Sequence, residues 1–150
     1  MPRSYGRISV VAVGKVRARY WLAAQDEYLK RLKHYTTFEL IEVKDAVGRG
    51  LTNEQAVDRE GQQLLQAASS AERTILLDPT GRELTSPQLA LELQSWLESS
   101  GSLAFLIGGP LGFSPAVYDA AHDSLALSQL TFTHEIARVL CLEQLYRAFT

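Results

Sequence analysis

Short apolar runs alternate along the chain with longer stretches in which apolar residues recur at helical spacing. The first run, Ile8 to Val13, is rich in β-branched residues and is closed by Gly14, which predicts a buried strand. Arg19 to Lys33 has the periodicity of an amphipathic helix. Phe38 to Val43 alternates between apolar and polar residues and predicts a second strand.

The alternation of strand and helix continues through the middle of the chain. After a loop over Asp45 to Thr52, Asn53 is placed to cap a helix that runs to about Ala68. Thr74 to Leu77 predicts a third strand, which Asp78-Pro79-Thr80-Gly81 should end with a turn. Ser86-Pro87 places a capping residue before a proline and predicts a helix through about Glu98.

The last third of the chain repeats the pattern. Leu103 to Ile107 predicts a fourth strand, Ser114-Pro115 starts a short helix to about His122, and Leu125 to Phe132 is a weaker fifth strand. Glu135 to Phe149 predicts a final helix. Because strands separated by helices are typical of parallel sheets, we predict an α/β fold with a parallel sheet of about five strands and flanking helices. The chain should form a single domain over residues 1–150.

Composition agrees with one globular domain. A hydrophobic content of 46% and a charged content of 21% are ordinary for that class. The single cysteine, Cys141, permits no internal disulfide, which suits a reducing compartment. Met1 to Arg7 lack the apolar core of a signal peptide, and no apolar run approaches the roughly 20 residues that cross a bilayer. We therefore expect a cytoplasmic protein without a membrane partner.

The net charge of −2 conceals an uneven distribution of charge. Residues 1–50 hold ten of the fifteen Lys and Arg and five acids, whereas the remainder holds five basic and twelve acidic residues. The basic residues cluster in Lys15-Val16-Arg17-Ala18-Arg19 and in Lys30-Arg31-Leu32-Lys33. Such clusters form either a phosphate-facing surface or a solvated helix face and loop. Because the rest of the chain is acidic, we expect any contact with nucleic acid to be local.

Three glycines and a proline follow the predicted fourth strand in Gly108-Gly109-Pro110-Leu111-Gly112. Ligands of parallel α/β sheets bind beyond the carboxyl ends of the strands, which makes this segment a candidate site. A phosphate-binding loop would need a lysine, but no Lys follows Gly112, and the pattern G-x-G-x-x-G is also absent. The glycines serve either the close approach of backbone to a flat ligand or a tight turn with positive φ.

The final helix is apolar on nearly every side and should therefore be covered on every side. We expect a second subunit to supply part of that cover. His134 and Arg138 lie four residues apart, hence on one helix face, and Glu143 and Arg147 form a second such pair. A histidine beside an apolar helix is either a structural residue or part of a site.

Motifs spread over the whole chain resemble those of one family. The matching segments are Val11-Ala12-Val13-Gly14-Lys15, Phe38-Glu39-Leu40-Ile41-Glu42, Leu77-Asp78 with Gly81, Leu106 to Pro115, Leu125 to Leu140, and Glu143-Gln144-Leu145-Tyr146-Arg147-Ala148. Together they resemble the SPOUT-class large-subunit rRNA pseudouridine methyltransferases, the small bacterial YbeA-like family. The combination is far more specific than a single glycine-rich loop.

The resemblance implies an α/β knot, in which the C-terminal segment is threaded through a loop to form the cofactor pocket. It implies a homodimer that transfers a methyl group from S-adenosylmethionine to N3 of a pseudouridine in helix 69 of 23S rRNA within the assembled ribosome, without a metal. S-adenosylmethionine has no phosphate, which fits glycines without a lysine. The cofactor-binding residues carried over by position are Leu77, Gly108, Leu127, Ser128, Gln129, Leu130, Thr131 and Phe132.

His134 and Arg138 are the catalytic candidates that the resemblance favours. Methyl transfer is an in-line displacement at a sulfonium, so the position of the acceptor nitrogen supplies much of the rate. The acceptor N3 also loses a proton, which needs a base or cationic support. We expect His134 to act as a base or orienting donor, and Arg138 to give electrostatic support or to position a phosphate.

The chain departs from the family after the Leu-Tyr-Arg-Ala segment. Family members continue into a short tail with Pro-Tyr-His-Arg near the acceptor site, whereas this sequence ends at Thr150; we expect catalysis to depend on that tail. Two alternatives stay open: a non-catalytic ribosome-binding protein on the same fold, and a flavodoxin-like module whose glycine turn binds a nucleotide phosphate. Only the methyltransferase requires binding of S-adenosylmethionine.

Overall fold

Across residues 6–150, the computed structural model of the protein shows one parallel sheet with strand order β2-β1-β4-β3-β5. The strands are β1 (Arg7–Val13), β2 (Thr37–Val43), β3 (Arg73–Glu83), β4 (Ser102–Ile107) and β5 (Asp123–Ala126). The helices are α1 (Arg19–Leu32), α2 (Asn53–Ala67), α3 (Ser86–Ser100), α4 (Pro115–Ala120) and α5 (His134–Phe149). The predicted α/β fold with a parallel sheet of five strands is confirmed. Residues 1–5, in the segment where we expected no signal peptide, lie outside the described residues.

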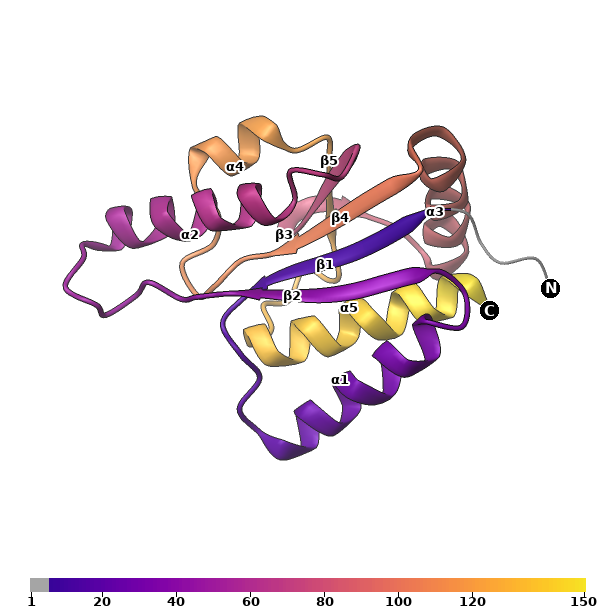
Figure 1. The fold of residues 1–150 in the computed structure, drawn as a ribbon, viewed down its shortest axis with the longest axis horizontal. Coiled ribbons are helices and arrows are strands. Elements are labelled where there is room, and N and C mark those ends of the chain that lie inside the picture. Colours follow the sequence, from indigo (N-terminus) through magenta and orange to yellow (C-terminus); the bar gives the residue numbers. More distant parts are fainter. Residues whose placement is uncertain (1–5) are drawn as a thin grey trace.

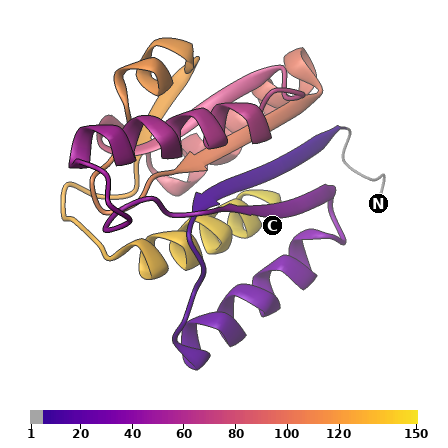
Figure 2. The ribbon, with the colours of Figure 1, turned by 60° about the vertical axis from the view of Figure 1, so that its left-hand side comes forward.

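Helices cover both faces of the sheet, with α2 and α4 on one side and α1 and α5 on the other (Figures 1 and 2). Helix α3 packs on the same face as α1 and α5. Successive side chains of a strand point to opposite faces, so β1 supplies Val10 and Ala12 to one layer and Val11 and Val13 to the other. Burial on both faces explains why the strands consist of nearly continuous apolar runs.

The register of the strands brings several chain segments to one edge of the sheet. Ala12 of β1 pairs with Ile107 of β4, and Ile107 pairs with Leu77 of β3. Because the strands are parallel, the loops after β1, β3 and β4 leave the sheet at this common edge. The candidate site lies there.

Strand β3 is longer than predicted. The expected turn at residues 78–81 is wrong, because the strand resumes at Arg82 and pairs with Leu125 of β5 after a shift of register from Leu77. Residues 78–81 therefore bulge out of the ladder. Gly81 permits this arrangement, since a Cβ there would lie 2.7 Å from the backbone nitrogen of Leu125. The turn-forming residues produce a bulge because β5 pairs with both parts of β3.

Strand β5 is shorter than predicted. It ends at Ala126, and residues 127–132, expected to continue the strand, leave the sheet as a loop that leads to α5. Within that loop the hydroxyl of Ser128 accepts a hydrogen bond from the N–H of Leu130 at 3.0 Å. Such local side-chain hydrogen bonds compete with pairing in a sheet. The loop is consequently free to form a wall of the site.

Two helices begin with a cap one residue earlier than predicted. The hydroxyl of Thr52 accepts from the N–H of Gln55, whose side chain accepts from the N–H of Thr52 in return. Asn53 is therefore the first helical residue rather than the cap, because the Thr-x-x-Gln sequence supplies both partners. Thr85 begins α3 in the same way, in place of Ser86.

Helix α5 is covered largely by other parts of the same chain. It packs against the sheet between α1 and α3, burying Val139, Cys141, Leu142 and Leu145. Its last turns contact α1 and the turn that follows it. The rings of Tyr146 and Tyr28 of α1 lie 5.9 Å apart, and Phe149 stacks on Tyr35, just after α1, at 5.5 Å. Much of the apolar surface of α5 is therefore buried without a second subunit. Leu140 is one of the α5 residues that stay partly exposed.

Three further properties of the described chain concern membrane spans, metal binding and its single cysteine. No helix within residues 6–150 has both the length and the apolar composition needed to cross a membrane. In the same range, no three His, Cys, Asp or Glu side chains come together where they could hold a metal ion. Cys141 is buried, and this burial raises the pKa of its thiol to about 12.

Candidate functional site

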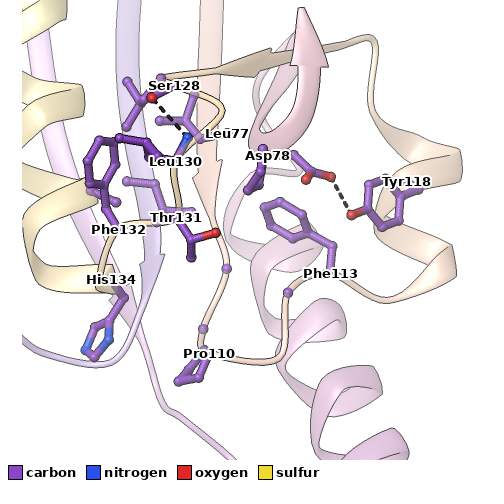
Figure 3. Close-up of a pocket in the computed structure, with 17 residues that line it drawn as sticks. Leu77, Asp78, Pro110, Phe113, Tyr118, Ser128, Leu130, Thr131, Phe132 and His134 are labelled. Carbon is purple, nitrogen blue, oxygen red and sulfur yellow. Dashed lines mark hydrogen bonds between the residues drawn. The ribbon is translucent and has the colours of Figure 1, made fainter.

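A pocket of about 210 Å³ opens at the edge of the sheet beside the bulge of β3 and the ends of β4 and β5 (Figure 3). Five segments form its walls: the bulge of β3, the loop after β4, Tyr118 of α4, the loop after β5 and the first turn of α5. Several predicted residues come together in its lining, namely Leu77, Gly108, Leu127, Ser128, Leu130, Thr131, Phe132 and His134. Segments that are far apart in the sequence therefore meet here.

Gln129 does not line the pocket, although it was expected to bind the cofactor with its neighbours. Its side chain is exposed. The hydrogen bond between Ser128 and Leu130 tightens the chain around this residue and leaves it on the solvent side. Leu130 lines the mouth of the pocket and is itself 72% exposed.

The sequence left two roles open for the glycines of the loop after β4, close approach of the backbone and a turn with positive φ. Different glycines of this loop serve these two roles. Gly112 has a φ of +80° and donates its N–H to the carbonyl oxygen of Gly109 at 3.0 Å, as a turn residue does. Gly108 and Gly109 have no positive φ. A Cβ on Gly108 would lie 3.2 Å from the carbonyl oxygen of Gly112, so that glycine serves close packing beside the pocket.

Asp78 and Tyr118 point toward each other on one side of the pocket (Figure 3). The phenol of Tyr118 donates a hydrogen bond to one carboxylate oxygen of Asp78, and the N–H of Thr80 donates to the other at 3.2 Å. Burial raises the pKa of Tyr118 to about 12, and Asp78 shifts it in the same direction. Phe113 meets the ring of Tyr118 edge to face at 5.8 Å.

These three side chains were not predicted as site residues. The position of Asp78 in the sequence could have marked it as a site residue, because it directly follows a predicted buried strand and ligands bind at the carboxyl ends of such strands. Tyr118 belongs to α4, whose predicted start at Ser114-Pro115 is confirmed by the hydrogen bond from the N–H of Val117 to the Ser114 hydroxyl. No sequence motif marked its ring as part of a pocket.

His134 is the first residue of α5, directly after the capping residue Thr133. It lies with Phe132 on the side of the pocket opposite Asp78 and Tyr118 (Figure 3). An imidazole in this position can exchange a proton with a ligand in the pocket. Its role as a base or orienting donor stays a prediction.

Arg138 does not line the pocket, which corrects the expectation that it contacts the reacting nitrogen or a phosphate. Its Nη1 donates to Glu42 Oε2 at 2.6 Å, and its Nη2 donates to the carbonyl oxygens of Val13 at 3.2 Å and Gly14 at 2.9 Å. The side chain is only 1% exposed. Burial lowers its pKa, and Glu42 opposes that shift. Arg138 thus joins α5 to the ends of β1 and β2.

The neighbouring Glu135 holds the first basic cluster beside α5. Its carboxylate accepts hydrogen bonds from the N–H groups of Arg17 at 3.0 Å and Ala18 at 3.4 Å. The cluster at residues 15–19 is thereby fixed next to the start of α5, where His134 lines the pocket. The second cluster, residues 30–33, lies at the far end of the 14-residue helix α1, roughly 20 Å away.

A second cavity of about 380 Å³ adjoins the pocket. Leu77, Leu127 and Phe132 line both. The other walls of the second cavity include residues of α3 and α5. The loop after β5 therefore separates two hollow regions.

Comparison with known proteins gives a consistent result over almost the whole chain. A family model described as "Predicted SPOUT methyltransferase" matches residues 7–150. A protein of Porphyromonas gingivalis named "Ribosomal RNA large subunit methyltransferase H" is 40% identical over 146 residues, which cover 96% of this chain and 93% of that protein. The protein of the same name from Anaeromyxobacter sp. is 44% identical over 144 residues, with coverage of 96% and 94%.

Two solved structures share the fold at low sequence identity. "A probable methylase family protein" from Haemophilus influenzae superposes with a TM-score of 0.56 at 13% identity, over 95% of this chain and 65% of that one. TrmJ from Z. mobilis superposes with a TM-score of 0.50 at 15% identity, over 96% and 69%. This chain spans about two thirds of the length of either structure, and the likeness concerns the fold alone.

Proposed function

Because this chain belongs to the SPOUT methyltransferase family, we propose that it is a 23S rRNA methyltransferase that uses S-adenosylmethionine. Its acceptor is N3 of a pseudouridine in helix 69, within the assembled ribosome of the cytoplasm. Proteins named "Ribosomal RNA large subunit methyltransferase H" are 40% and 44% identical to this chain over nearly its full length, which supports this assignment. The observation that carries it in the structure is the pocket beside the bulge of β3 and the ends of β4 and β5.

The residues of the pocket fit S-adenosylmethionine. Gly108 presents backbone without a side chain, and Leu77, Leu127 and Phe132 provide apolar surface for a flat base. The hydroxyl of Thr131 adds a hydrogen-bonding group. When bound, the cofactor supplies a methyl group on a positively charged sulfur.

The protein contributes position and proton transfer. The first turn of α5 holds His134 at the pocket, where it accepts the proton of the acceptor nitrogen or orients the base. Arg138 is a positioning residue, because it fixes the start of α5 against Gly14 and Glu42. Orienting donor and acceptor in line supplies much of the rate in such a displacement.

The basic cluster at residues 15–19 is the proposed contact with rRNA phosphates. Lys15, Arg17 and Arg19 are exposed. Glu135 keeps their backbone beside the start of α5, and therefore next to the pocket. So small a cluster binds naked RNA weakly, which favours a large shaped target such as the ribosome.

The finer features of the family follow as part of the same proposal. We infer that residues 127–150 form the threaded part of a knot, as the family resemblance implies. We also infer a homodimer in which α5 and the start of α1 face the partner. Tyr20 is 70% exposed and Leu22 is 40% exposed at the start of α1, which Glu135 holds beside α5.

A methyl-transfer assay on ribosomes tests the function. The protein is incubated with radiolabelled S-adenosylmethionine and ribosomes that lack the methyl group, and mass spectrometry of the digested rRNA locates the product. Ribosomes that already carry the methyl group are the matched control and should accept no further methyl group at that position. Binding of ribosomes without methyl transfer would favour the non-catalytic alternative, and binding of FMN or ATP in place of the cofactor would favour the nucleotide-binding one.

A further inference from the structure

The pocket carries negative charge without a fixed positive charge to balance it. Among the lining residues, all of which lie within the described range 6–150, Asp78 is the single carboxylate and none is Lys or Arg. Asp78 is 7% exposed. Burial of a charge is unfavourable unless hydrogen bonds or an opposite charge compensate for it. A cationic ligand would provide that compensation, whereas a neutral ligand of the same shape would not.

The two donors that hold Asp78 are both neutral. They are the N–H of Thr80 and the phenol of Tyr118. Because the pKa of Tyr118 is raised to about 12, its phenol stays protonated near neutral pH and remains a donor. These hydrogen bonds orient the carboxylate of Asp78 but leave its charge in the pocket.

A second carboxylate approaches the glycine loop from behind. Glu60 of α2 is 1% exposed, and its Oε2 accepts from the N–H of Ala46 at 2.9 Å. Its Oε1 is buried without a hydrogen-bond partner and would lie 3.1 Å from a Cβ on Gly109. Two acids therefore flank the loop after β4.

We propose that Asp78 is a specificity residue that makes the pocket prefer the cationic methyl donor to the neutral thioether that remains after transfer. This inference rests on the proposed function, in which S-adenosylmethionine is the donor. In that reaction the methyl group leaves the sulfonium for the acceptor nitrogen, the nitrogen loses its proton to a base, and sulfur keeps the electron pair of the broken bond. The sulfur becomes neutral, so its attraction to Asp78 is lost. Product release and rebinding of the donor are both favoured.

Calorimetry of the full chain with two ligands tests this. S-adenosylmethionine and S-adenosylhomocysteine carry the same ammonium and carboxylate and differ by the methyl group and the sulfonium charge. The change of their affinity ratio on substitution of Asp78 therefore reports its effect on that charge. We expect Asp78→Asn to weaken binding of S-adenosylmethionine about tenfold and to change that of S-adenosylhomocysteine by less than about twofold. The matched control is Asp119→Asn on α4, an exposed acid that does not line the pocket; it should change neither affinity.

A second variant keeps the charge and removes one of its donors. Tyr118→Phe frees one oxygen of Asp78 for the ligand, so we expect binding of S-adenosylmethionine to strengthen about twofold while binding of S-adenosylhomocysteine stays unchanged. This variant decides the question if Asp78→Asn does not fold. An equal effect on both ligands, including no effect on either, would overturn the inference while leaving the proposed function intact. A wild-type chain that binds no S-adenosylmethionine would overturn both.

Discussion

Arg138 and Glu42 form an ion pair of 2.6 Å in which the arginine is almost completely buried. Replacing Arg138 with Met leaves Glu42 and the carbonyl oxygens of Val13 and Gly14 without their donor. Removal of one partner from a buried pair costs about 3–5 kcal/mol, but the Glu42 side chain is 30% exposed and stays partly solvated. We therefore expect the free energy of unfolding to fall by about 3 kcal/mol. Urea unfolding measures it.

The exposed pair Arg147 and Glu143 on the same helix is the matched control for that experiment. Its atoms lie 3.2 Å apart, and the Arg147 side chain is 60% exposed. Arg147→Met should therefore lower the free energy of unfolding by less than about 1 kcal/mol. If Arg138→Met instead kept full stability and lost only methyl transfer, the positioning role would be wrong and a direct catalytic role would return.

Gly108 offers a test of the cofactor site. A Cβ there would lie 3.2 Å from the carbonyl oxygen of Gly112 and 3.3 Å from the ring of Phe113. We expect Gly108→Val to abolish binding of S-adenosylmethionine, because its methyl groups occupy space at the pocket wall, with only a small loss of melting temperature.

Gly50→Val should show the opposite balance. Gly50 does not line the pocket, its φ of +77° costs a branched residue about 1–2 kcal/mol or more, and a Cβ there meets no atom within 4 Å. Calorimetry and thermal unfolding on both variants separate the two effects. A Gly108→Val protein that melts far lower yet binds normally would show that this glycine serves only the local fold.

The two basic clusters should differ in their effect on ribosome binding. Arg17 and Arg19 lie beside the pocket, whereas Lys30 and Lys33 lie at the other end of α1. We expect the double change Arg17→Ala with Arg19→Ala to weaken ribosome binding and to flatten its dependence on salt, because each lost phosphate contact reduces the slope by about one. Filter binding over a range of salt concentrations measures this.

The corresponding change at Lys30 and Lys33 removes the same charge and should leave affinity nearly unaltered. If the two double variants weakened ribosome binding equally, only the net charge would matter and the proposed contact surface would be wrong.

Glu135 makes stability depend on pH in a defined direction. The N–H of Arg17 holds the pKa of Glu135 below its ordinary 4.5, and the N–H of Ala18 acts the same way. A carboxylate with a lowered pKa in the folded state contributes stability above its unfolded pKa and loses that contribution as the pH falls through the folded value. Glu135→Gln should thus be less stable than the wild type by about 1 kcal/mol at pH 7.

Below pH 4 that difference should shrink, and urea unfolding at both pH values shows whether it does. Glu98→Gln, an exposed acid on α3, is the control and should behave like the wild type at both. A deficit of Glu135→Gln that stayed constant down to pH 3 would mean that the ionised carboxylate is not what holds the basic cluster.

The proposed dimer buries part of α5. Leu140 is a partly exposed residue of this helix and lines the second cavity. Leu140→Glu would bury an unpaired charge in the interface, so we expect dissociation to monomers. Sedimentation at micromolar concentration should show a dimer for the wild type and a monomer for the variant. A wild-type protein that sediments as a monomer would refute the proposal.

The pattern of apolar residues was sufficient for the sheet and its helices, because strands buried on both faces require runs such as Ile8 to Val13. The pattern failed where the structure that a segment prefers locally differs from the structure that its contacts with other residues produce. Asp78-Pro79-Thr80-Gly81 has the composition of a turn, but β5 pairs on both sides of it and produces a bulge. Residues 127–132 have strand composition, yet a hydroxyl and a neighbouring N–H hold them in a loop.

Site residues that belong to a sequence motif could be predicted. Site residues that reach the pocket only through the packing of their helix could not. The glycines after β4 and the segment before His134 both carry sequence signals, and they meet in the pocket. Tyr118 carries none, since its position depends on how α4 packs. Arg138 is the opposite case, a residue that the sequence predicted in the site and the structure places outside the pocket. Its spacing of four from His134 suggested a shared site, whereas the ion pair with Glu42, far away in the chain, holds its charge elsewhere.

The pocket joins residues from Leu77 to Ala137, so no single fragment of the chain contains it. A chain that has formed its sheet but has not yet seated residues 127–150 lacks seven of the seventeen lining residues. A ligand that binds only the native state stabilises that state by a free energy that rises with the logarithm of the ligand concentration. A ligand in the pocket therefore stabilises fully folded molecules and not those in which residues 127–150 are still unseated. The concentration of ligand in the cell becomes one of the conditions that set the amount of fully folded protein.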